Sequence, residues 1–376
     1  MIDLDPPPLV PDVPPAPFFH REPLIAAAVL CALVLGAFVI IGSPVQLLNL
    51  AAGVWFTELV IFCGLSFALL QVFGSDPVRE TGLDSTTPRA VVLGFALGLV
   101  NYLAWAIPLM AGVEKVLPKW LLEVFNGAQI FKHLSGVELV LVVAGLGLAA
   151  PFAEEFFFRG VVQKALSARL PPPRAIVVTA LIFSAFHLDP VGFLARFELG
   201  VLFGLLAWRS GSIWPGVAAH AANNLLATAL FFASSEQSAD TDVPVWALLA
   251  CLAGGNLLLI GLARFSFGKL RSPRPAERHD VPPLSVARAA APWLLASLVI
   301  LGLAAGLDWR GAELRLFELA NPPPKMSGLK AALEDPALEP LRVKARRGEV
   351  PMEAYFDAWR ARNQAPSIVP GTLDPQ

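Results

Sequence analysis

The sequence predicts an all-α polytopic membrane protein, built as a bundle of about eight to nine transmembrane helices. Of the 376 residues, 56% are hydrophobic and only 15% are charged, and the mean hydropathy is +0.63. These values depart strongly from the averages of soluble domains. In addition, the apolar residues gather in stretches of about 20, the length of a helix that crosses a bilayer. With a net charge of −2, we expect a lipid bilayer as the surroundings and no nucleic-acid partner.

Nine apolar stretches are predicted to span the membrane. In chain order they are residues 24–42, 48–73, 88–112, 137–158, 174–188, 193–208, 212–233, 245–263 and 289–307. The fifth and sixth are the shortest. The Pro-rich leader, residues 1–23, has little positive charge, and no small-residue cleavage pattern follows it, so we expect the first helix to be retained.

The stretches divide the chain into a main bundle and a C-terminal part. The predicted parts after the leader are the bundle 24–265 with a core at about 90–233, a basic loop 266–288, an extra transmembrane helix 289–307 and a soluble tail 308–376. Pro292 near the start of the extra helix leaves an alternative, in which this helix lies on the membrane surface. Within the tail, a short helix is predicted near Met352 to Arg362.

Loop charges predict the orientation in the membrane, because Lys and Arg in short loops favour the cytoplasmic side. The loop after the fourth stretch contains Arg159, Lys164, Arg169 and Arg174. By contrast, Ser234 to Asp242 contains acidic residues and no basic one. We therefore expect a cytoplasmic N-terminus, a cytoplasmic 266–288 loop and a tail on the opposite side. High Ala, Pro and Arg usage without an organelle signal favours a bacterial inner membrane.

Three polar motifs interrupt the apolar stretches: Glu154-Glu155-Phe156-Phe157-Phe158-Arg159, Phe183-Ser184-Ala185-Phe186-His187 and His220-Ala221-Ala222-Asn223-Asn224. Ionisable groups at membrane depth are costly and usually functional. Counted from the basic loop, Glu154 and His187 lie at similar depths of roughly 20 Å, at 1.5 Å of rise per helical residue. We therefore expect the three motifs to converge inside the bundle.

Helical spacing suggests roles for these side chains. Glu155 and Arg159 are four residues apart in the favourable order for an ion pair on one helix face. Glu154 is then left without a cation and is a candidate general base or acid. His220 and Asn224 also share a face and can present donors to a developing negative charge.

This ordered set of motifs resembles the CPBP family of intramembrane proteases, also called the Abi family, which includes CAAX proteases and bacteriocin-processing enzymes. The resemblance covers about residues 90–233 and implies helices around a conical intramembrane catalytic cavity. It implies that Glu154 and His187 activate a water, that His220 and Asn224 stabilise the oxyanion, and that Glu155 and Arg159 support the site. The implied substrate is a membrane-anchored or lipidated protein or peptide. It is cut after a lipidated cysteine or within a C-terminal sorting or leader segment.

Alternatives stay open at this point. A non-catalytic bacteriocin-immunity or scaffold protein of the same fold is one, and a transporter or proton relay is another, although no inverted repeat is evident. Glu154, His187 and His220 are candidate ligands of a divalent metal such as zinc, in a site with an open position for water. However, the chain has no His-Glu-x-x-His motif, and glutamate-activated water needs no metal. The sequence thus allows a metalloprotease or a glutamate-type protease.

Several other polar residues near the predicted helices are interpreted as structural. Asn223 is expected to be a packing amide, or to replace Asn224 if the helix is rotated. Glu58, and Arg196 with Glu198, are expected to form interhelical or interfacial pairs rather than to act in catalysis.

Overall fold

The computed structural model describes residues 21–84, 86–131, 134, 136–233, 244–267, 281–322, 335 and 337–363. Within these residues all regular structure is helical and no strand occurs, which confirms the all-α class. Almost all of the Pro-rich leader, the acidic segment Ser234 to Asp242 and most of the basic loop lie outside the described residues.

Each of the nine predicted stretches coincides with helix. In the part of the chain that the structure describes, six helical stretches have the length and apolar composition to cross a membrane: Pro23–Leu48, Leu50–Val72, Pro88–Val116, Gly136–Ser167, Trp214–Ala233 and Val286–Ala320. The remaining three correspond to α13 (Pro172–Phe186), α14 (Phe193–Ser210) and α16 (Val245–Phe267). The exact number of membrane crossings therefore stays a prediction.

The long stretches are built from shorter α and π segments. The first contains α2 (Pro23–Ala37), η1 (Phe38–Gly42) and α3 (Ser43–Leu48), and the second contains α4 (Leu50–Trp55), η2 (Phe56–Gly64) and α5 (Leu65–Val72). The third contains α7 (Pro88–Asn101), η3 (Tyr102–Ala106) and α8 (Ile107–Val116). The fourth contains α10 (Gly136–Ala144), η5 (Gly145–Ala149), α11 (Ala150–Glu155), η6 (Phe156–Val162) and α12 (Gln163–Ser167). Short connecting helices are α6 (Pro77–Thr81), α9 (Lys119–Val124) and η4 (Gly127–Phe131).

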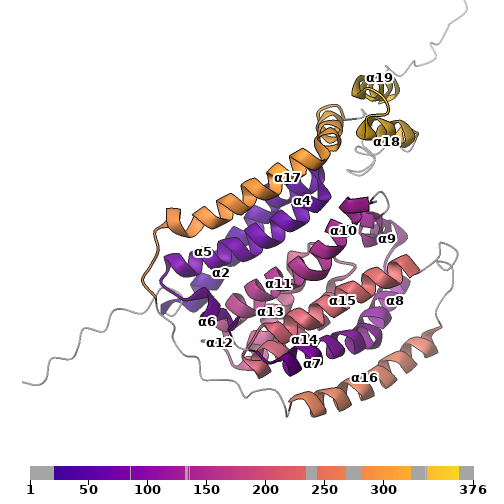
Figure 1. Cartoon of the computed structure of the whole chain (residues 1–376). Coiled ribbons are helices and arrows are strands. Elements are labelled where there is room, and N and C mark those ends of the chain that lie inside the picture. The colour runs from indigo at the N-terminus through magenta and orange to yellow at the C-terminus, as the bar shows by residue number, and fades with distance from the viewer. Residues whose placement is uncertain are drawn as a thin grey trace, which may run out of the picture.

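The fourth stretch crosses the middle of the bundle beside α13, α14 and α15 (Trp214–Ala233) (Figure 1). On one side, α17 (Val286–Ala320) runs along α4 and α5, and on the opposite side α16 runs along α7 and α8 (Figure 1). The main hydrophobic core gathers phenylalanines around the middle of the fourth stretch, including Phe156, Phe157, Phe158, Phe183 and Phe203. The polar motifs therefore lie beside the main hydrophobic core.

Glycines let α7 approach α15, the helix that carries His220. Gly94 and Gly98 form a small-xxx-small pair on α7, and a Cβ added at either would collide with backbone atoms of Pro215 or Ala219 on α15. Membrane helices commonly use such pairs to bring their backbones together. The close approach fixes the position of α15 in the bundle.

Gly98→Ala is expected to destabilise the protein by about 1–3 kcal/mol, because the new methyl group has no room against the backbone of α15. Gly112→Ala is a matched control from the same helical stretch, since no atom lies within 4 Å of its added Cβ, and alanine is the better helix former. Thermal unfolding of both variants in the same detergent checks the difference. Equal melting temperatures for Gly98→Ala and the unaltered protein would contradict the proposed close packing.

The C-terminal helices form a second small core at one end of α17. Helix α17 bends at Asp308, which has non-helical backbone angles, and continues to Ala320. Helices α18 (Glu339–Arg347) and α19 (Met352–Asn363) pack on this end, beyond the main bundle (Figure 1). This core contains Leu314, Ala345, Met352, Tyr355 and Trp359. The short helix predicted near Met352 to Arg362 is confirmed.

Charged side chains fasten these C-terminal helices to the bundle. Arg346 contacts Asp308 at the bend of α17 (2.5 Å) and Glu138 in the first turn of α10 (2.8 Å). Burial acts against the charged form of Arg346, but hydrogen bonds and charge from these two carboxylates raise its pKa above its ordinary value. Arg346 therefore stays cationic across the physiological pH range. The contact ties the C-terminal part to the start of the helical stretch that carries Glu154.

Candidate active site

Glu154 and Glu155 end helix α11, where the fourth stretch changes from α to π geometry. The π segment η6 then carries Arg159. Short π segments within membrane-length helices often mark functional sites, because they turn side chains out of the regular helical register. The first polar motif is thus placed at such a change of geometry.

The predicted ion pair between Glu155 and Arg159 is present and wholly buried. Arg159 Nη1 lies 2.7 Å from Glu155 Oε1, and both side chains have 0% exposure. Arg159 also donates from Nη2 to the carbonyl oxygen of Gly200 on α14 (3.0 Å), and its guanidinium carbon lies 4.5 Å from the ring centroid of Phe183. Arg159 therefore ties η6 to α13 and α14 as well as to Glu155.

His220 lies between the two carboxylates of the first motif. Its Nε2 is 4.0 Å from Glu154 Oε2, and its Nδ1 is 3.3 Å from Glu155 Oε1, although this second contact is not aligned as a hydrogen bond. The ring is buried and stacks on Phe203, with centroids 4.8 Å apart. Phe203 and Glu155 together hold the imidazole with Nε2 directed toward Glu154. Sequence spacing gave no sign of this contact between His220 and Glu155.

His187 forms the C-cap of α13 and is exposed. Its Nδ1 lies 2.9 Å from the carbonyl oxygen of Phe183. Because a carbonyl can only accept, Nδ1 carries the proton and Nε2 is the free, basic nitrogen. The ring of Phe183 has edge contacts with both imidazoles, at centroid distances of 5.1 Å to His187 and 5.9 Å to His220. His187 interacts electrostatically with Glu154 and His220, so the motifs of α11, α13 and α15 belong to one cluster.

The segment after His187 is fixed by its own contacts. Leu188 has a positive φ of 51°, and the Asp189 carboxylate accepts a hydrogen bond from the backbone N–H of Val191 (2.9 Å). Arg196 pairs with Asp189 at 2.5 Å. Arg196 and Glu198 do not pair with each other, since residues two apart on a helix point in different directions, but each has a partner outside its own helix. Glu198 instead accepts from Asn101 on α7 (2.8 Å).

The two asparagines after His220 form a small amide chain. Asn224 donates to the carbonyl oxygen of Leu146 on η5 (2.8 Å), and Asn223 donates to the Asn224 side-chain oxygen (3.2 Å). One of the two N–H groups on the Asn224 amide is thus used to join α15 to the fourth stretch. The Asn223 side-chain oxygen is buried and has no partner among the described residues.

Glu58 is a further acidic residue of this region, and sequence reasoning interpreted it as structural. It lies on η2, is 8% exposed, and interacts electrostatically with Glu154. The spacing of residues in the sequence cannot predict that Glu58 lies near Glu154, because the two residues belong to different helical stretches. A charged residue in the middle of an apolar stretch was the only available sign.

A metal site needs several donor side chains that lie close together. Among the residues that the structure describes, no group of three or more His, Cys, Asp or Glu side chains is placed to hold a metal ion. Zinc binding by Glu154, His187 and His220 therefore stays a prediction from the sequence. Metal analysis of the purified protein tests the zinc expectation directly.

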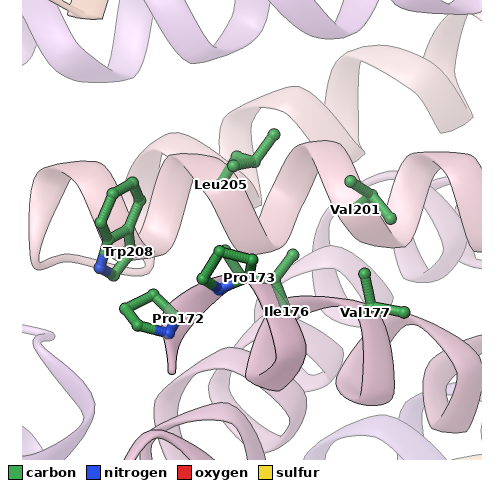
Figure 2. Close-up of a pocket in the computed structure, with 7 residues that line it drawn as sticks. All are labelled: Pro172, Pro173, Ile176, Val177, Val201, Leu205 and Trp208. Carbon is green, nitrogen blue, oxygen red and sulfur yellow. The ribbon is translucent and has the colours of Figure 1, made fainter. Parts of the chain in front are cut away.

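A separate groove lies between α13 and α14 and is wholly apolar (Figure 2). It is lined by Pro172, Pro173, Ile176, Val177, Val201, Leu205 and Trp208. None of the predicted site residues lines it. The groove brings no polar group that can take part in hydrolysis.

The segment that contains all three motifs matches a known family. Residues 136–226 match the protein-family model described as type II CAAX prenyl endopeptidase Rce1-like. The resemblance drawn from the motifs is thus confirmed for this part of the chain. No curated protein and no solved structure matches the chain.

Proposed function

We propose that this Rce1-like CAAX prenyl endopeptidase domain is an active intramembrane protease. It hydrolyses a peptide bond near the membrane anchor of a lipidated or membrane-anchored protein. The observation that carries the proposal is the arrangement around His220, whose Nε2 lies 4.0 Å from Glu154 while Glu155 and Arg159 form a buried ion pair behind it. A base, an imidazole donor and a rigid support are thus assembled inside one helix bundle.

The proposed reaction uses Glu154 as the general base. Glu154 takes a proton from water, His187 assists by accepting that proton from Glu154 at its free Nε2, and the water oxygen attacks the carbonyl carbon of the scissile bond. His220 and Asn224 donate hydrogen bonds to the oxyanion that forms. The proton then passes to the leaving nitrogen, the C–N bond breaks, and the products are a carboxylic acid and an amine. Glu155 and Arg159 keep His220 and the π segment in place.

The proposed orientation agrees with contacts at the two ends of the bundle. Arg169, in the basic loop, donates to the backbone oxygen of Arg21 (3.3 Å), so the start of the first helix lies at the same end as that loop. Arg346 contacts Glu138 at the opposite end of the fourth stretch. These contacts put the start of the first helix and the C-terminal part at opposite ends of the bundle. Together with the basic loop, this supports our proposal of a cytoplasmic N-terminus. The proposed location, the bacterial inner membrane, rests on composition alone.

Cleavage of a defined peptide tests the proposed function. Purified protein in lipid vesicles is expected to release the C-terminal tripeptide from a farnesylated Cys-a-a-X peptide, as measured by mass spectrometry. The same peptide without the lipid is the control, and we expect little cleavage of it because the anchor brings the scissile bond to the site.

Equal cleavage of both peptides would remove lipidation from the substrate class and favour a sorting or leader segment. No cleavage of either peptide, or of a membrane-anchored leader peptide, would contradict the protease proposal and favour the immunity, scaffold or transporter alternatives. Adding a chelator to the active enzyme tests whether a metal takes part.

A further inference from the structure

Glu58 is held firmly against the helical stretch that carries Glu154. Glu58 is the third residue of η2, which begins at Phe56. Immediately before η2, the Trp55 side chain donates a hydrogen bond to the carbonyl oxygen of Leu141 on α10 (2.9 Å). Later in η2, the ring of Phe62 meets Phe157 edge-on, with centroids 5.5 Å apart. These contacts lie on both sides of Glu58 and fix its position relative to α11 and η6.

Both Glu58 and Glu154 bury a carboxylate oxygen that has no protein partner. Oε2 of each side chain is buried and lacks a hydrogen bond within the described part of the chain. The segments that carry these two side chains, η2 and α11, pack against each other, and the charge of Glu154 acts on Glu58. The neighbouring Arg159 donates to Glu155 and to the carbonyl oxygen of Gly200, and it makes no hydrogen bond to either of these two oxygens.

A purely structural role does not explain Glu58. A buried carboxylate with an unmade hydrogen bond costs stability, and the packed segments α2, η1 and η5 contain no charged residue that offsets the cost. In α17, the Trp293 side chain packs on η2 at Gly64. The cost is instead understandable if the two free oxygens act together on one small polar ligand.

We propose that Glu58 is a positioning residue of the hydrolytic site, and that its Oε2 accepts the second hydrogen of the water that Glu154 activates. This inference rests on the proposed function. A water has two hydrogens to donate, and a buried water typically makes about three hydrogen bonds. With one hydrogen held by each carboxylate, the oxygen lone pair is directed away from both acids, toward the substrate carbonyl. Fixing a reactant in this way lowers the entropic part of the barrier.

Two substitutions at Glu58 separate acceptance of a hydrogen bond from packing. Glu58→Met keeps the length of the side chain but removes the acceptor, and we expect kcat to fall about 10- to 100-fold. KM should stay within about twofold, because Glu58 contacts the water and not the substrate. Glu58→Gln keeps an acceptor oxygen, so kcat should stay within about threefold of the unaltered enzyme. Thermal unfolding of Glu58→Met should occur at the same or a higher temperature, because a buried carboxylate that no protein group hydrogen-bonds has been replaced by an apolar side chain.

The outcomes distinguish this inference from the proposed function itself. If Glu154→Gln abolishes cleavage while Glu58→Met turns over normally, only the role of Glu58 is wrong. If Glu154→Gln is fully active, the proposed function fails as well. If Glu58→Gln is as slow as Glu58→Met, Glu58 does not act by accepting a hydrogen bond, and the inference is overturned. If both Glu58→Met and Glu58→Leu fail to fold, the role of Glu58 is structural and the inference is overturned.

Discussion

Glu154→Gln is expected to abolish peptide cleavage while leaving the fold intact. The amide has nearly the size of the carboxylate but cannot take a proton from water, and losing a general base typically costs about 10² to 10⁴ in rate. Glu154 Oε2 has no hydrogen-bond partner among the described residues, so the substitution breaks no hydrogen bond at this oxygen. The measurement is kcat on the lipidated peptide together with the melting temperature.

Glu198→Gln is the matched control for this experiment. Glu198 is a partly buried carboxylate of the same bundle that accepts a hydrogen bond from Asn101, and the Gln side-chain oxygen can accept it equally well. This control should keep both activity and stability. Activity of Glu154→Gln equal to that of the control would disprove the general-base mechanism.

Glu155→Gln is expected to lower both stability and activity. It leaves Arg159 buried without its carboxylate, and breaking a buried ion pair by changing one partner costs about 3–5 kcal/mol. Since both side chains have 0% exposure, water cannot replace the missing partner. The loss of activity follows because Glu155 also lies beside His220 Nδ1.

A double replacement separates these two effects. Apolar residues of similar volume can replace a buried ion pair with little loss of stability, so Glu155→Leu combined with Arg159→Met should unfold at a higher temperature than Glu155→Gln. It should still be inactive, because His220 has lost the carboxylate that orients it. A double variant that recovers activity would assign the pair to folding alone.

The sequence was sufficient to predict contacts within one helix, such as the pair of Glu155 and Arg159. It was also sufficient for the positions of the helices, because the apolar stretches have clear ends. Contacts between helices were harder to predict. A helix that is apolar on all sides does not show which face is turned inward. The spacing of residues therefore could not predict that Glu58 and Glu154 lie near each other. The same holds for the hydrogen bond of Asn224 to Leu146 on another helix.

The contact of Arg346 with Glu138 has a consequence for the newly made chain, because these residues are 208 positions apart. At roughly 5–20 residues per second of synthesis, Glu138 is made on the order of 10 to 40 s before its partner. Until then the carboxylates of Glu138 and Asp308 lack the cation that they share in the finished protein. The first turn of the helical stretch that carries Glu154 thus gains this contact only after Arg346 has been made.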